Sequence, residues 1–169
     1  GTWGRPQACP ASGVRMIDVS NPAEPAVIDA IADGSEFPGT DTDSVWAGAI
    51  ETDAYTGDIA VVAISLCDNR ERNRFRDDFR GLAVYDVSDP VDPVILDYLN
   101  TPGSPSGVDV DGGNTYAFIA SGVLLFQTVD LTLPTSLDLK STYNGTGTTT
   151  ARGAAVRGDN AYVAATNPS

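Results

Sequence analysis

Apolar positions between residues 81 and 99 predict two short strands joined by a proline-rich corner. The stretch GLAVYDVSDPVDPVILDYL carries apolar residues on both alternating faces of its first strand, with Leu82 and Val84 on one face and Tyr85 on the other. That pattern is typical of a strand that is covered on both sides. Helical periodicity over ten or more residues is missing from the sequence, so we predict an all-β protein.

The same module occurs earlier in the chain. Residues 13–31, GVRMIDVSNPAEPAVIDAI, align without a gap with residues 81–99, which lie 68 positions later. The matched pairs are Gly13 with Gly81, Asp18 with Asp86, Pro22 with Pro90, Pro25 with Pro93 and Asp29 with Asp97. We expect Asp18 and Asp86 to cap their corners, because Asp side chains can accept hydrogen bonds from nearby backbone amides.

A weaker third copy is predicted at residues 122–140, GVLLFQTVDLTLPTSLDLK. A gapless alignment places Gly122, Pro134 and Asp138 on the glycine, the second proline and the later aspartate of the module, and puts Leu131 where the first proline stands. This alignment predicts an altered corner in the third copy.

A second kind of segment alternates with the first. GVDVDGGNTYAFIA (107–120) and GAAVRGDNAYVAAT (153–166) match at a constant spacing of 46 residues, and each has apolar residues on either side of a Gly/Asn/Asp turn. Such a pattern predicts a β-hairpin. A longer hairpin of the same kind is expected at residues 45–65.

Together the two segments make a unit of four short antiparallel strands, which is the pattern of a β-propeller blade. We expect one domain over residues 1–169, with about two full blades and two half blades. The expected pieces are a partial blade at 1–31, a blade at 44–99 with an inserted loop at 67–80, a blade at 106–141 and a half blade at 152–169. Because a propeller needs roughly four to eight blades, the chain is expected to be part of a larger propeller or to associate with further copies.

The motifs GLAVYDVSDPVDP and GDNAYVAA resemble those of the LVIVD-repeat family of prokaryotic β-propeller proteins. The resemblance covers nearly all of the chain apart from the insertions. It implies a propeller fold and an extracellular or cell-surface location. It brings no catalytic residues, because that family has no agreed set.

Composition narrows the range of partners. The net charge is −13, from 23 acidic and 10 basic residues, so the average surface repels nucleic acid and anionic lipid. No run of about 18 apolar residues is present, so no membrane span is predicted.

The two cysteines, Cys9 and Cys67, do not form a CxxC pair, and we expect a disulfide between them, with two buried free thiols as the alternative. Asn144 begins the tripeptide Asn-Gly-Thr, which is an acceptor pattern for N-glycosylation. Both features favour an extracellular protein.

The sequence contains no histidine, which excludes Ser-His-Asp and Cys-His catalysis. Carboxylates remain as candidates for binding calcium, at Asp41 and Asp43 and at Asp109 and Asp111. At the second pair we favour turn chemistry over calcium, because the matching hairpin has Ala155 and Arg157 at the corresponding positions.

One arginine-rich segment lies outside the repeat. Residues 67–80, CDNRERNRFRDDFR, hold half of all the basic residues, interleaved with acidic ones. The candidate ligand-binding arginines are Arg70, Arg72, Arg74 and Arg76. They either pair with the neighbouring acidic residues or bind an anionic glycan or acidic protein.

The function predicted from these features is that of an extracellular or cell-surface scaffold that binds a protein or a glycan. Two alternatives remain open. One is a structural subunit whose copies pair into an assembly or filament. The other is a metal-dependent hydrolase or lyase that works with carboxylates.

Overall fold

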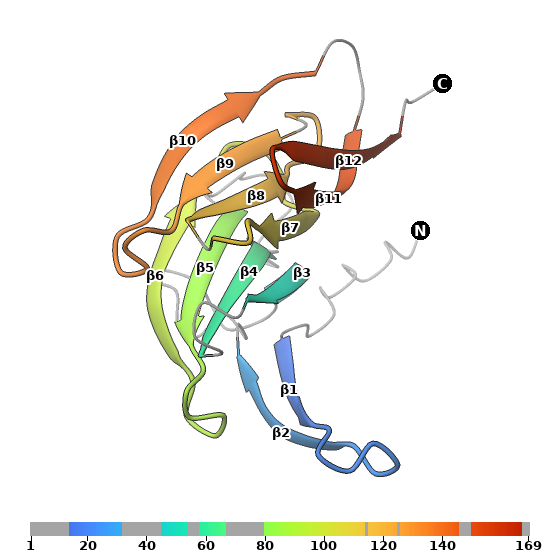
Figure 1. The fold of residues 1–169 in the computed structure, drawn as a ribbon, viewed down its shortest axis with the longest axis vertical. Helices are drawn as coiled ribbons and strands as arrows, with labels where there is room; N and C mark the ends of the chain where they lie inside the picture. Colours follow the sequence, from blue (N-terminus) through green and yellow to red (C-terminus); the bar gives the residue numbers. More distant parts are fainter. Residues whose placement is uncertain are drawn as a thin grey trace, which may run out of the picture.

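The structure is a computed structural model that describes residues 14–31, 45–53, 58–66, 80–113, 115–124, 126–145 and 150–166. Its first strands are β1 (Val14–Asp18), β2 (Ala26–Ile31), β3 (Val45–Asp53), β4 (Ile59–Leu66), β5 (Arg80–Asp86) and β6 (Val94–Asn100). The remaining strands are β7 (Gly107–Val110), β8 (Tyr116–Ala120), β9 (Phe126–Asp130), β10 (Asp138–Tyr143), β11 (Thr150–Arg157) and β12 (Asn160–Thr166). Every regular element in these ranges is a strand, so the predicted all-β class is confirmed (Figure 1).

The strands form four antiparallel sheets in chain order. Two sheets are complete, with strand orders β3-β4-β5-β6 and β7-β8-β9-β10, and two are hairpins, β1-β2 and β11-β12. Within the described ranges there is no helix of the length and apolarity that a membrane crossing requires.

The main core lies between the two complete sheets. One half of it comes from β4 and β5, including Val61 and Leu82, and the other half from β7, β8 and β9, including Ile119 and Val129. The opposite face of β5 is also buried, since Tyr85 is only 1% exposed. The prediction that this strand is covered on both sides is therefore confirmed.

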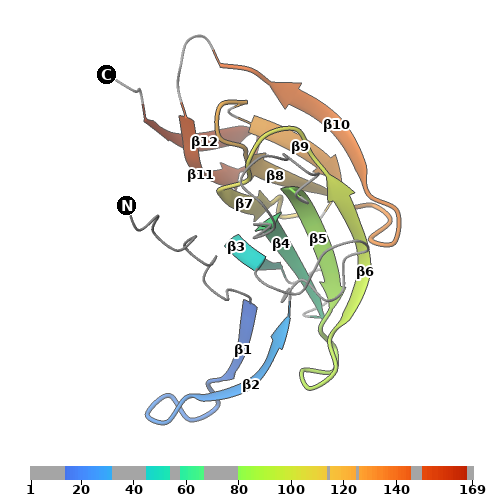
Figure 2. The same cartoon turned by 180° about the vertical axis from the view of Figure 1, so that it is seen from behind.

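The first strands of three successive sheets, β3, β7 and β11, lie side by side (Figures 1 and 2). Gly107 allows β7 and β11 to lie close together, because a Cβ atom at this position would lie 2.9 Å from the Cα of Gly153 on β11. Ser106 Oγ also donates a hydrogen bond to the Ala151 carbonyl of β11, at 2.8 Å. Backbone proximity thus holds β11 against the sheet β7–β10.

Three corners have the same local structure. Asp18 Oδ1 accepts from the Ser20 amide at 2.8 Å, and Asp86 Oδ1 accepts from the Ser88 amide at 2.9 Å, so the predicted caps are confirmed. The third corner is formed by Asp130, whose Oδ1 accepts from the Thr132 amide at 2.8 Å. In each case the strand after the corner carries one extra residue, namely Ile28, Leu96 and Lys140.

The gapless alignment of the third copy was therefore wrong. Asp130 is the counterpart of Asp86, and Pro134 is the counterpart of Pro90, not of Pro93. Gly122 caused the error, because it is not the counterpart of Gly81 inside β5. It has a φ of 52° and its carbonyl accepts from the Ala151 amide at 2.8 Å. The corner of the third copy is intact.

The 46-residue spacing also fails over the second strand of the last hairpin. Gly107 pairs with Ala120, but Gly153 pairs with Ala164, two residues earlier than that spacing predicts. The hairpin β11–β12 closes early because Gly158, with a φ of 57°, allows a two-residue turn between Arg157 and Asn160.

Candidate functional site

Most of the predicted site residues lie outside the described residues. These are the arginines Arg70, Arg72, Arg74 and Arg76, the acidic pair Asp41 and Asp43, and the cysteines Cys9 and Cys67. Asn144 is described and exposed, directly after β10. The calcium, disulfide and glycosylation hypotheses therefore stay predictions.

The described residues do show where the arginine-rich segment starts and ends. It connects the end of β4, at Leu66, to the start of β5, at Arg80. We call this end of the two complete sheets the loop edge. The connections 67–79, 101–106, 121–125 and 144–149 all begin and end there, because these strands are antiparallel.

The described connections of the loop edge are bonded to one another. Ser121 Oγ donates to the Pro102 carbonyl at 3.0 Å, and Ser121 is fully buried. Gly103 has a φ of 91°, and a Cβ there would lie 2.6 Å from that same Ser121 oxygen. A fixed base of this kind holds the ends of neighbouring loops in constant positions, which is what loop-borne recognition requires.

The loop edge also exposes apolar side chains. Val123 is 69% exposed and Tyr143 is 60% exposed. Exposed aromatic side chains such as tyrosine are enriched in recognition surfaces between proteins.

Asp109 and Asp111 serve the backbone. Asp111 Oδ1 accepts from the amides of Thr115, at 2.6 Å, and Tyr116, at 2.9 Å, and so closes the β7–β8 turn. Asp109 Oδ2 accepts from the Val156 amide of β11. The favoured interpretation of Asp111 as a turn residue is confirmed, and no group of three potential metal-ligating side chains occurs in the described ranges.

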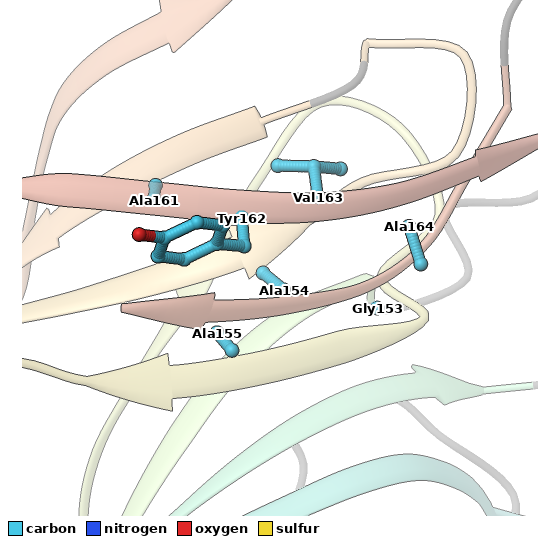
Figure 3. Close-up of a pocket in the computed structure, with 7 residues that line it drawn as sticks. All are labelled: Gly153, Ala154, Ala155, Ala161, Tyr162, Val163 and Ala164. Atoms are coloured by element: carbon cyan, nitrogen blue, oxygen red, sulfur yellow. The ribbon is translucent and has the colours of Figure 1, made fainter. Parts of the chain in front are cut away.

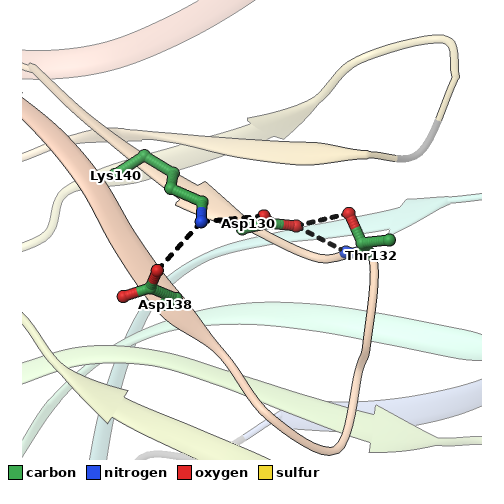
Figure 4. A network of polar contacts seen from close by, with 4 residues as sticks. All are labelled: Asp130, Thr132, Asp138 and Lys140. Carbon is green, nitrogen blue, oxygen red and sulfur yellow. Dashed lines mark hydrogen bonds and ion pairs between the residues drawn. The ribbon is translucent and has the colours of Figure 1, made fainter.

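A charged cluster that sequence reasoning missed lies at the third corner (Figure 4). Lys140 Nζ lies 2.9 Å from Asp138 Oδ2 and 3.2 Å from Asp130 Oδ2. Asp130 also accepts from the Thr132 hydroxyl at 2.5 Å. These contacts, with the Thr132 hydrogen bonds first and the Lys140 charge after them, lower the pKa of Asp130 from 3.8 to about 2. The cluster depends on Lys140 being the extra residue of β10, where the other copies have Leu96 and Ile28.

Asp97 was also missed as a contact between sheets. Its Oδ2 accepts from the Leu137 amide at 2.7 Å, which ties β6 to the corner of the next sheet. Leu137 stands at the position of Pro93, and a proline has no amide hydrogen to donate. The loss of the second proline in the third copy was the available signal.

An open depression of about 650 Å³ follows the hairpin β11–β12 (Figure 3). Its lining residues are Gly153, Ala154, Ala155, Ala161, Tyr162, Val163 and Ala164. The Tyr162 hydroxyl is the single polar side-chain group in this lining. Small-molecule sites usually combine apolar walls with several converging polar groups, so this surface is better suited to contact with protein.

Comparison with protein families gives one match. The model of the LVIVD repeat matches residues 11–33, which include β1, its corner and β2. The chain carries an LVIVD repeat. This confirms the resemblance indicated by the motif, and the corners at Asp86 and Asp130 have the same hydrogen bonds as the corner of the matched LVIVD repeat. The search of curated proteins found no match.

Proposed function

We propose that this LVIVD-repeat chain is a propeller-like scaffold that binds a protein or a glycan at its loop edge, in an extracellular or cell-surface setting. The observation that supports the proposal is the bonded base formed by the connections 101–106 and 121–124. The arginine-rich connection leads into β5, and the connection 101–106 leaves β6, the strand that pairs with β5. Repeated sheets supply rigidity, and the loops between them supply contacts that differ from one another.

The second part of the proposal is the chemistry of the ligand. Closely spaced arginines form paired hydrogen bonds with carboxylates and sulfates, and such bonds are stronger than those between neutral groups. The net charge of −13 repels anions over the rest of the surface, so binding of an anionic ligand depends on this local concentration of arginines. We therefore propose sulfated or carboxylated glycans, or acidic protein segments, as ligands.

The test is binding of the chain to an array of sulfated, carboxylated and neutral glycans. Replacing both Arg72 and Arg74 with Ala is expected to weaken binding at least about tenfold, since each charge-assisted hydrogen bond contributes roughly 1.5–3 kcal/mol. Arg157→Ala is the matched control, because Arg157 is an exposed arginine at the β11–β12 turn, at the other end of its strand from the loop edge.

Unchanged binding in the double variant would remove the arginine-rich segment from the proposal. An equal loss in Arg157→Ala would show that binding follows overall charge and not the loop edge.

A structural-subunit function has separate support. Two of the four sheets are incomplete among the described residues, and no described strand pairs with the second edge of β1 or of β12.

A further inference from the structure

The two incomplete sheets are complementary halves of the same unit. The hairpin β1–β2 has the corner bond and the extra residue that mark the third and fourth strands of both complete sheets. The hairpin β11–β12 has the features of a first and second strand. Its extra residue, Arg152 of β11, corresponds to Gly48 of β3, which is the extra residue in the pairing of β3 with β4. Each half therefore contains the two strand types that the other half lacks.

Strand β12 resembles strand β4 in sequence and in pairing. Residues 161–166 read AYVAAT, and residues 60–65 read AVVAIS. The pairing partners agree, because Ala63 pairs with Ala49 and Ala164 pairs with Gly153, each directly after the extra residue. In the complete sheet, β4 has β5 along its other edge, whereas no described strand pairs with the corresponding edge of β12.

We propose that two copies of this chain associate by reciprocal strand addition, with β12 of each copy pairing with β1 of the other. Each junction would complete a four-stranded sheet in the order β11-β12-β1-β2. This inference rests on the propeller-like arrangement proposed above, but it assigns a partner, an interface and a register that the binding proposal does not need.

The positions of the two halves favour a second copy as the partner. Among the described strands, β1 pairs with β2 alone and β12 pairs with β11 alone. Figures 1 and 2 place β1 and β12 on opposite sides of the inner strands β3 and β7, so these two edges do not meet within one chain. A second copy supplies the complementary strand to each edge, and pairing at both junctions covers both.

The complete sheet fixes the register of the junction. Ala60, Val61 and Val62 of β4 pair with Tyr85, Val84 and Ala83 of β5. The corresponding pairs across the junction are Ala161 with Ile17, Tyr162 with Met16 and Val163 with Arg15 of the partner copy. Ile17 is 50% exposed and Tyr162 is 62% exposed in the single chain, and both positions are buried in the complete sheet.

Hydrogen-bonding direction alternates along β12, which makes a selective variant possible. The Val87 amide donates to the Asp58 carbonyl, so alternate residues of β4, including Ala60 and Val62, direct their backbone groups toward β5. By correspondence, Val163 directs its amide away from β11, toward the unpaired edge. Val163→Pro removes that donor without removing a hydrogen bond between β11 and β12.

The first experiment measures molar mass by light scattering and sedimentation over a range of concentrations. We expect the unmodified chain to have twice the 17.6 kDa mass of the single chain. Val163→Pro is expected to be a single chain with unchanged far-ultraviolet circular dichroism, and Val163→Ala, which keeps the amide, is expected to remain a pair. A single-chain mass at all concentrations, or open polymers that lengthen with concentration, would overturn the proposal.

The second experiment tests the register. A copy with Tyr162→Cys is mixed with a copy with Met16→Cys and oxidised, because residues in this kind of antiparallel pair bring their side chains closest together. Mass spectrometry of peptides is expected to find the 16–162 link between chains. Two control mixtures use a copy with Ile17→Cys or a copy with Asp18→Cys in place of the Met16→Cys copy. Residue 17 lies on the opposite face of β1, and residue 18 lies two positions away, so neither control is expected to give a link of comparable yield.

A higher yield of the link between positions 18 and 162 than of the 16–162 link, or no link at all, would contradict the proposed junction. Neither result would affect glycan binding, so failure of this inference and failure of the binding proposal are distinguishable.

Discussion

Strands β4 and β12 have related sequences and very different surroundings. Val61 and Val62 of β4 are 1% and 0% exposed, whereas Tyr162 at the position of Val61 is 62% exposed. The difference comes from the neighbours, since β4 has strands on both edges and a second sheet against its face, and β12 pairs with β11 alone among the described strands. A repeated sequence therefore specifies the strand, while burial depends on how many repeats stand beside it.

The largest change in stability is expected when an apolar side chain of the covered strand β4 is replaced. Ile64 of β4 is fully buried, and Ile64→Ala is expected to lower the free energy of unfolding by about 2–5 kcal/mol, through lost burial and a cavity. The matched position on β12 is Ala165, which is exposed. Ala165→Ile is expected to change the free energy of unfolding by less than about 0.5 kcal/mol, as surface substitutions usually do.

Urea unfolding measures both changes, at concentrations where the chain is single. If Ala165→Ile destabilised the protein as much as Ile64→Ala, β12 would have to be tightly covered in the single chain, and the contrast between the two strands would be lost.

A smaller effect is expected where the inner strands meet. A Cβ at Gly107 would lie 2.9 Å from the Gly153 Cα, so Gly107→Ala forces the two backbones apart, with an expected loss of about 1–3 kcal/mol. Gly153→Ala is the control, because a Cβ there has no atom within 4 Å. Thermal unfolding should separate the two variants, and equal losses would mean that the contact between β7 and β11 does not limit the approach.

Local features were predictable from the sequence, and contacts between sheets were not. The caps at Asp18 and Asp86 were predicted because the donor amide lies only two residues away. The third corner was missed because Gly122 drew the alignment out of register, although Asp130, Thr132 and Pro134 repeat the spacing of the other corners.

The contact between Asp97 and Leu137 depends on which strands become neighbours, and residue patterns within one strand do not contain that information. The same holds for Asp109, which was considered as a calcium ligand or a turn residue. In the structure its carboxylate accepts a hydrogen bond from the Val156 amide of the next sheet. The candidate arginines could be predicted as a segment, but their contacts lie outside the described residues.

The smallest expected effect concerns the one corner with a lysine. The pKa of Asp130 is lowered from 3.8 to about 2, first by the hydrogen bonds from Thr132 and then by Lys140, while the pKa of Asp86 is lowered by Ser88 alone. Because the folded pKa is below the unfolded value, the ionised carboxylate stabilises the fold above about pH 4. This contribution is lost as the pH falls from about 4 toward about 2.

Lys140→Met should therefore raise the pKa of Asp130 while leaving it below 3.8, because the Thr132 bonds remain. The pKa of Asp86 should not change, since Lys140 is absent from its environment. Carbon-detected NMR titration of the Asp carboxyl groups measures both values in one sample. A pKa of Asp130 that is unaffected by Lys140→Met would assign the whole shift to the Thr132 bonds of the corner, and Lys140 would then have no part in it.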